Sequence, residues 1–543
     1  MKKIIASILT LSMLLVLPAC GGTGITEEIT PPPEAGGSSD SGGSDSGTPS
    51  NQGDDSTAAT LKDSIVVAAA QEPDIFFPYH STKTTHMDEV PILHNVYEAP
   101  IKLNPDSTHA PLLAESWEVS DDGLDYTLHI REGVKFHNGD ILTAEDVAFT
   151  VNYGITAPAT GNIMINVEGA EAIDDNTVVI HLSSPFGGFL NSLCARYAVI
   201  INKAYFEEVG EDGYLENPIG TGPYKFVSRV SGDTITLEAF EDYWGEAPAI
   251  KTIYYKTMTD PNTQIMALEN NEIDVLINAN LSPLLQLAPD SPVKWETQTA
   301  ASQTLMHFNM GDANQISANA DFRRAVQYAV DKKELSLGVF EGYAEVAPIV
   351  IGLNFTGRPD EGTFKTAERD LDKAREYLEA ANYDNEEFSI VVMTGTKAES
   401  AAQIIQGQLI EAGINCTVNA VDAISYDAIT IQSGQFGASL RTTTSSTLDA
   451  DCMYFNFYGP YLSREVYDIG NHTDELDQLM LDGRAESDPE KRKEIYAEAV
   501  DLVTDEALSV PVYYDINVVA YNENMRGVKP GPVISLYYMN DWS

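Results

Sequence analysis

Strand-like patterns of apolar residues recur along the chain from Ser64 onward. In "DYTLHIR" (125–131), Tyr126, Leu128 and Ile130 occupy alternate positions and therefore share one face. This period of two predicts a half-buried strand. The same pattern predicts strands in "NTVVIHL" (176–182), "DTITLEAF" (233–240) and "KTIYYKTM" (251–258), and a short apolar run predicts one in "SIVVAAA" (64–70).

A period of three to four residues predicts helices in the second half of the chain. In "DFRRAVQYAVDKKEL" (321–335), Phe322, Val326, Ala329 and Val330 share one face. Gly413 at the end of "AESAAQIIQGQLIEAG" (398–413) is a typical helix terminator. Further helices are predicted in "LDKAREYLEAANY" (371–383) and "DPEKRKEIYAEAVDLVTDEA" (488–507). Strands and helices interleave without a strict repeat, which predicts a multi-lobed α/β protein.

The N-terminus carries a separate pattern. Lys2 and Lys3 precede an apolar run from Ile4 to Leu17, which is shorter than the roughly 20 residues of a membrane span. It predicts a secretory signal. The run ends in "LPAC", which resembles the lipobox of bacterial lipoproteins and implies lipidation of Cys20. We therefore expect a lipoprotein signal peptide at 1–20, followed by a disordered linker at 21–61, rich in Gly, Ser, Pro and acidic residues.

Length and charge limit the class of protein. The chain has 543 residues, enough for more than one domain. Acidic residues outnumber basic ones by 82 to 32, a formal net charge of -50. Nucleic acid is excluded as a partner because phosphate binding needs clustered Lys and Arg. The charge indicates either a solvated surface or a cationic ligand.

The stretch "REGVKFHNGDILTAEDVAFT" (131–150) is dense in polar side chains. A metal site would pair His137 with Asp140, but the spacing fixes no third ligand. We favour a structural interpretation, a strand, an Asn-Gly turn and a helix that begins after Thr143 with Asp146 completing a capping box. No GxSxG, HExxH, P-loop or catalytic-triad arrangement is present. We therefore expect no enzyme, no cofactor and no metal site.

Five segments occur in the order typical of one protein family. They are "DDGLDYTLHIREGVKFHNGDILTAEDVAFT" (121–150), "NPIGTGPYKFV" (217–227), "FEDYWGEAPAIKTIYYK" (240–256), "DFRRAVQYAVDKKEL" (321–335) and "LSVPVYYDINVVAYNENMRGV" (508–528). In these segments the chain resembles the family 5 extracellular solute-binding proteins of bacterial ABC importers, which include oligopeptide, dipeptide and nickel receptors.

This resemblance implies a two-lobed periplasmic-binding-protein-like α/β fold, of the class II or cluster C type. Lobe I would comprise 62–300 with an inserted subdomain at 107–214, lobe II 301–507, and 508–543 would return to lobe I. The strand "TLMHFNM" (304–310) and the segment "SVPVYYD" (509–515) would form the two hinge crossovers. Ligand would be held by closure of the lobes.

The resemblance also implies a function. We expect a monomeric receptor, anchored through Cys20 at the extracytoplasmic face of the cell membrane, that delivers oligopeptides to ABC permease subunits. Alternatives are a nickel or metal-chelate receptor, a receptor for another small solute, a sensor or adhesin, and a surface hydrolase.

Candidate ligand-binding residues follow from the same resemblance. Peptide-binding members use an Asp shortly before an Asp-Pro step to bind the peptide ammonium. Here Thr and Ser occupy that region, from Thr442 to Thr447, and Ala450 replaces the Pro. Arg441 could clamp a carboxylate or phosphate, or form a salt bridge within the protein. The complete candidate set is Tyr79, His80, Asn309, Arg441, Thr443, Asp449, Asp451 and Tyr454.

Overall fold

The computed structural model of the protein describes residues 62–543 apart from 74–75, 82–89, 105, 158–159, 161–162, 196–197, 466–468 and 532–538. The predicted signal peptide, Cys20 and the linker at 21–61 lie outside the described residues. Cys194, Cys416 and Cys452 are all free thiols.

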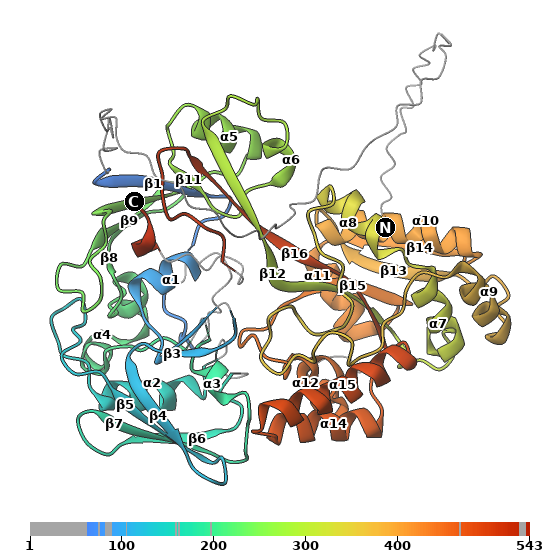
Figure 1. The fold of residues 1–543 in the computed structure, drawn as a ribbon, viewed down its shortest axis with the longest axis horizontal. Coiled ribbons are helices and arrows are strands. Elements are labelled where there is room, and N and C mark those ends of the chain that lie inside the picture. Colours follow the sequence, from blue (N-terminus) through green and yellow to red (C-terminus); the bar gives the residue numbers. More distant parts are fainter. Residues whose placement is uncertain are drawn as a thin grey trace, which may run out of the picture. The chain divides into compact units, whose positions relative to one another are not determined.

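One ten-stranded mixed sheet runs through the described part of the chain (Figure 1). In spatial order its strands are β14 (Cys416–Val421), β13 (Phe388–Met393), β15 (Ala438–Thr443), β12 (Val293–Phe308), β16 (Ser509–Asn522), β11 (Val275–Leu276), β1 (Ser64–Ala69), β10 (Thr252–Thr257), β9 (Thr234–Ala239) and β8 (Tyr224–Val230). We call the part built around β1 and β8–β11 lobe I, and the part built around β13–β15 lobe II.

Two smaller antiparallel sheets belong to lobe I. The larger lies within the predicted insert at 107–214 and contains β4 (Ala114–Val119), β5 (Asp125–Ile130), β7 (Thr177–Leu182) and β6 (Val167–Ala172). The other pairs β2 (Ile101–Leu103) with β3 (His109–Pro111). In β5 the predicted alternation is confirmed, because Tyr126, Leu128 and Ile130 are buried while the residues between them are more exposed.

Helices pack around these sheets. Lobe I contains α1 (Val90–Val96), α2 (Ala144–Gly154), α3 (Phe189–Ser192), α4 (Lys203–Glu216), α5 (Pro261–Glu269) and α6 (Leu281–Leu284). Lobe II contains α7 (Ala320–Ala329), α8 (Lys332–Phe340), α9 (Leu371–Ala380), α10 (Lys397–Ala412), α11 (Ala423–Asp427), α12 (Cys452–Phe457), α13 (Gly459–Glu465), α14 (Asp474–Ala485) and α15 (Pro489–Asp505).

The two long strands β12 and β16 connect the lobes. The first half of β12 pairs with the second half of β16 in lobe I, and the second half of β12 pairs with the first half of β16 in lobe II. Between these halves the register shifts, from Thr299 opposite Ile516 to Gln303 opposite Tyr514. A bulge of this kind breaks the hydrogen-bond ladder and bends the strand, here at the point where β12 and β16 pass from one lobe to the other.

One predicted helix is two helices. The expected helix over 321–335 ends at Ala329, Val330 is extended (φ -79°, ψ 122°), and α8 begins at Lys332. The Asp331 side chain accepts hydrogen bonds from the backbone N–H groups of Lys333 and Glu334. The apolar period continued through this position, but a side chain that caps a new helix outweighs it. The end of α10 is as predicted, with Gly413 in a left-handed conformation at φ 100°.

The polar stretch 131–150 has the structural role that the sequence predicts. The backbone N–H of Thr143 donates to Asp146 Oδ2 at 2.9 Å, and α2 begins at the next residue. The His137 ring lies between two backbone groups, with Nε2 2.9 Å from the Gly222 oxygen and Nδ1 accepting from the Gly220 N–H at 3.3 Å. Burial lowers the pKa of His137 to about 4, so the ring is neutral near pH 7. His137 thus joins two of the five family segments.

The glycines of "GTGPY" are required by close packing. A Cβ atom at Gly220 would lie 2.1 Å from the backbone oxygen of Val96, and one at Gly222 would lie 2.7 Å from that of Asn95. These distances exclude any larger side chain without movement of α1. The segment is a packed turn before β8, as expected, and not a phosphate-binding loop.

Candidate functional site

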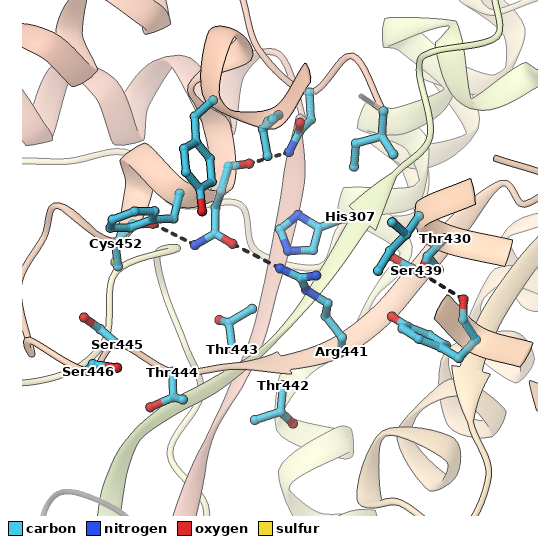
Figure 2. Close-up of a pocket in the computed structure, with 18 of the residues that line it drawn as sticks. His307, Thr430, Ser439, Arg441, Thr442, Thr443, Thr444, Ser445, Ser446 and Cys452 are labelled. Carbon is cyan, nitrogen blue, oxygen red and sulfur yellow. Dashed lines mark hydrogen bonds between the residues drawn. The ribbon is translucent and has the colours of Figure 1, made fainter. Parts of the chain in front are cut away.

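A cavity of about 440 Å³ lies against one face of lobe II. Its walls are β15, the loop from β15 to α12, the segment between α11 and β15, and helices α12 and α13 (Figure 2). Ile163 of the predicted insert also lines it, so residues of both lobes contribute. The described lining residues are Ile163, His307, Tyr426, Thr430, Ile431, Phe436, Ser439, Arg441, Thr442, Thr443, Thr444, Ser445, Ser446, Thr447, Cys452, Phe455, Asn456, Tyr461, Leu462, Ile469 and Asn471.

Strand geometry brings the polar residues of this wall together. β15 pairs antiparallel with β12, and Ser439 lies opposite His307. Residues directly opposite each other share a face, and alternate residues along a strand share it too. Ser439, Arg441, Thr443 and His307 therefore face the cavity, while Ala438 and Leu440 belong to the buried apolar core on the other face. The sequence predicted Arg441 and Thr443 but gave no role to His307.

Arg441 is solvent-exposed and makes one long polar contact, from Nη2 to Asn456 Oδ1 at 3.5 Å. No carboxylate lies within ion-pairing distance of it among the described residues. Of the two roles left open by the sequence, an internal salt bridge is therefore excluded for the described part of the chain. The guanidinium lines the cavity with no ion-pair partner among the described residues.

His307 is 4% exposed, and neither of its ring nitrogens has a hydrogen-bond partner within the described structure. Burial, and then the positive charge of Arg441, lower the pKa of His307 to about 3. The imidazole is therefore neutral near pH 7 and carries one N–H donor and one acceptor nitrogen. Buried polar groups without partners are uncommon in proteins and call for an explanation.

Comparison with known proteins identifies the family to which the chain belongs. The family model for bacterial extracellular solute-binding proteins, family 5, matches residues 108–463. The chain belongs to this family. It is a substrate-binding protein of an ABC importer and not an enzyme, as predicted.

Individual relatives agree with this assignment. The glutathione-binding protein GsiB of Escherichia coli K12 is 27% identical over 454 residues, which are 80% of this chain and 86% of that protein. The ABC transporter substrate-binding protein CtaP of Listeria monocytogenes is 27% identical with a TM-score of 0.78, covering 89% of this chain and 99% of its own.

The oligopeptide-binding protein AppA of Bacillus subtilis, solved with a nonapeptide, is 25% identical with a TM-score of 0.71, covering 88% and 98%. These similarities confirm the predicted fold class, an α/β periplasmic-binding-protein fold with an additional antiparallel subdomain.

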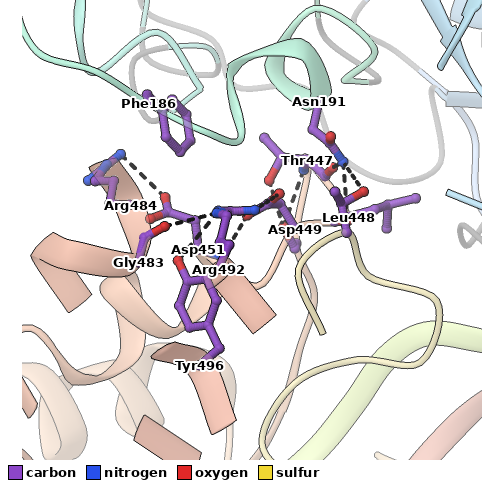
Figure 3. Close-up of polar contacts among 12 residues, drawn as sticks. Phe186, Asn191, Thr447, Leu448, Asp449, Asp451, Gly483, Arg484, Arg492 and Tyr496 are labelled. Carbon is purple, nitrogen blue, oxygen red and sulfur yellow. Dashed lines mark hydrogen bonds and ion pairs between the residues drawn. The ribbon is translucent and has the colours of Figure 1, made fainter. Parts of the chain in front are cut away.

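Two predicted residues of this solute-binding protein, Asp449 and Asp451, form ion pairs within lobe II and do not line the cavity (Figure 3). Arg492 donates from Nη1 to Asp449 Oδ2 at 2.8 Å and from Nη2 to Asp449 Oδ1 at 2.5 Å, and its Nε donates to the Gly483 oxygen. Asp449 is 0% exposed. Burial would lower the pKa of Arg492, but the adjacent Asp449 carboxylate outweighs it and raises that pKa.

The arginine of the second ion pair also contacts Tyr454, another predicted residue. Arg484 lies 3.3 Å from Asp451, and its guanidinium carbon is 4.0 Å from the centre of the Tyr454 ring. The same guanidinium is 4.9 Å from the ring of Phe186 in the insert. Tyr454 therefore packs on Arg484, whereas its neighbour Phe455 lines the cavity. Sequence alone could not tell which of these two aromatic residues lines the cavity.

The remaining predicted residues lie outside the cavity lining. Tyr79 is buried in lobe I and donates to the Val199 oxygen at 2.7 Å. His80 is buried beside Glu211 and Asp212, each 3.5 Å away. Asn309 donates to the oxygens of Gly434 and Phe436, and so holds the loop that carries Phe436 into the cavity wall.

Asn191 joins the insert to lobe II at the edge of the cavity (Figure 3). Its Nδ2 donates to the Thr447 oxygen at 2.8 Å, to Thr356 Oγ1 at 3.0 Å and to the Leu448 oxygen at 3.3 Å. Its Oδ1 lies 2.9 Å from His109 Nε2. The sequence gave no signal for this contact, because the partners are separated by more than 160 residues along the chain.

Two further searches concern the described residues only. No group of three or more His, Cys, Asp or Glu side chains is placed to hold a metal ion there. Within the same residues, none of the helices has the length and apolar character needed to span a membrane.

Proposed function

We propose that this substrate-binding protein is a lipoprotein that captures small peptides or peptide-like solutes and delivers them to the permease subunits of its importer. The observation that carries the proposal is the position of the cavity, between β15 of lobe II and Ile163 of the insert and close to the β12–β16 connection. A volume of about 440 Å³ lies within the range of sites that enclose small molecules.

Binding would follow from contact with both lobes. A solute that touches lobe II alone leaves the open and closed forms equally stable, whereas one that also contacts the insert favours closure. Rotation would occur at the register shift opposite Tyr514 and Ile516. The relatives described above as glutathione-binding and as solved with a nonapeptide support a peptide-like substrate.

Native mass spectrometry of the protein as purified tests the substrate. We expect a mass excess that corresponds to small peptides and disappears on denaturation, and addition of peptides to the emptied protein should raise its melting temperature. A bound metal chelate, or a solute without amide bonds, would overturn the peptide assignment.

The anchor needs a separate test. Cys20→Ser should abolish metabolic labelling with a radioactive fatty acid and move the protein from the membrane fraction to the soluble fraction. Unchanged labelling of this variant would overturn the proposed lipidation of Cys20.

A further inference from the structure

The charge of the cavity is opposite to that of the protein. Acidic residues outnumber basic ones by 82 to 32 in the chain, yet the described residues that line the cavity include no Asp, Glu or Lys. Arg441 is the one charged side chain among them. A cavity formed without selection in such an acidic protein would be expected to contain carboxylates. The lining instead favours a ligand with negative charge.

Hydrogen-bond donors on the adjacent strands β12 and β15 lie close together in the cavity wall. Figure 2 shows the His307 ring and the Arg441 guanidinium next to each other in the cavity. His307 and Ser439 are directly paired, and Arg441 lies two residues farther along β15 on the same face. The ring nitrogens of His307 have no partner in the described structure, and Arg441 has only the 3.5 Å contact to Asn456.

The groups that face His307 are few. Beside it are Arg441 on β15 and the Phe457 ring of α12, whose centroid is 6.1 Å away. The other titratable lining residues are Tyr426, Cys452 and Tyr461. Burial raises the pKa of Tyr426 and Cys452, so both stay uncharged near pH 7. No negative charge in the described lining therefore competes with a ligand for Arg441.

We propose that this cavity is a carboxylate subsite, in which the Arg441 guanidinium binds both oxygens of a solute carboxylate and an N–H of His307 donates a further hydrogen bond. The planar fork of an arginine matches the geometry of a carboxylate. The residues from Thr443 to Thr447 also line the cavity and carry neutral hydroxyl groups that can donate or accept hydrogen bonds.

The same residues predict what the cavity does not bind. A free ammonium group buried at a protein site needs a nearby carboxylate, and none lines the described cavity. The inference rests on the proposed capture of peptide-like solutes and specifies which end of the solute this cavity recognises. A C-terminal or side-chain carboxylate should be essential, and a free amino terminus should not be needed here.

The inference is tested by comparing the binding of peptides that differ only in whether each end is free or blocked. One tripeptide library is prepared with free ends, with acetylated N-termini and with amidated C-termini, and a second panel contains non-peptide di- and tricarboxylates such as succinate, glutarate and citrate. Isothermal titration and thermal shift are measured on the emptied full-length protein. We expect acetylation to change affinity less than threefold and amidation to weaken it about 10- to 100-fold, the range for loss of a hydrogen-bonded charge.

Substitutions of Arg441 and His307 test whether these two residues cause the preference for a free carboxylate. Arg441→Gln should weaken binding of free-acid ligands about 10- to 100-fold and should leave the amidated forms almost unaffected. Arg375→Gln is the matched control, because Arg375 is exposed on α9 and pairs with Asp372 at 3.4 Å. His307→Leu should weaken binding about 3- to 10-fold, and His307→Gln, which keeps a donor, should recover part of the loss. Melting temperatures verify that each variant is folded.

The outcomes separate the two proposals. If non-peptide carboxylates bind through Arg441 and peptides do not, the carboxylate subsite is supported and the peptide assignment fails. If peptides bind with the same affinity after amidation and after Arg441→Gln, the receptor is supported and the subsite is overturned. If no carboxylate in either panel binds, the subsite is also overturned.

Discussion

Arg441 and His307 in the cavity wall differ from Arg492 and His137 in the framework of the same molecule. Arg492 is buried and makes a bidentate ion pair with Asp449, and His137 contacts backbone groups through both ring nitrogens. Arg441 and His307 have almost no such partners within the described residues. The residue types are the same in the two regions, so residue type does not distinguish a structural group from a ligand-binding one.

The difference lies in where the hydrogen-bonding capacity is used. A buried charge is tolerated only when it is paired, so the framework residues must contact other protein groups for the fold to be stable. In the proposed carboxylate subsite, the cavity residues use that capacity to bind a solute. We therefore expect framework substitutions to lower stability and cavity substitutions to lower affinity, and four experiments test this separation, in order of expected effect.

The largest effect should come from Asp449→Ala. It leaves the buried guanidinium of Arg492 without its carboxylate, and loss of one partner of a buried ion pair costs about 3–5 kcal/mol. Urea denaturation should show this decrease, whereas Arg441→Ala should lie within about 0.5 kcal/mol of the wild type. Comparable losses of stability in both variants would show that Arg441 is also a structural residue.

Reversal of the cavity charge should affect binding and not folding. Arg441→Glu removes the guanidinium and places a second negative charge beside the ligand carboxylate, so affinity for free-acid ligands should fall by more than about 100-fold, or about 2.7 kcal/mol. Titration calorimetry measures the loss, and the melting temperature of the empty protein should not change. Tight binding of the same carboxylates by this variant would contradict the assignment.

His137 provides a pH test of the framework. Its pKa is about 4 in the folded protein, below the ordinary 6.5, so between these values the unfolded chain binds a proton that the folded protein does not. The wild type should therefore lose about 1–2 kcal/mol relative to His137→Gln as the pH falls from 7 to 5. Melting temperatures at both pH values measure the difference. Altered ligand affinity of the variant at pH 7 would contradict a purely structural role.

The smallest effect should come from the contact between the lobes. Asn191→Ala removes three hydrogen bonds that join the insert to lobe II and should shift the closed-to-open equilibrium by about 1–2 kcal/mol. Small-angle X-ray scattering of the empty protein should show a larger radius of gyration. Asn152→Ala is the control, since its side chain bonds to Ala170 within the insert. Equal scattering curves for the two variants would exclude this role for Asn191.

Local pattern was enough to predict much of the fold. The period-two segment at 125–131 is a strand, Thr143 and Asp146 begin a helix, and Gly413 ends one. These features depend on neighbouring residues and were therefore readable from the chain. The helix predicted through Val330 was wrong because a single cap at Asp331 outweighed a continuous apolar period. The family and the class of function also followed from the order of five segments.

Which residues form the site depended on contacts between residues that are far apart in the sequence. Arg441 and Asp449 are eight positions apart and were equally good candidates, but Arg492 pairs with Asp449 and no carboxylate of the described residues pairs with Arg441. His307 gave no signal at all, since its importance comes from the strand register that places it beside Ser439. The sequence alone determined many of the elements, the family and the general function, because these follow from local periodicity and motif order. Only the tertiary structure decided which polar groups are already paired and which remain available to a solute, because pairing depends on residues that meet only after the chain has folded.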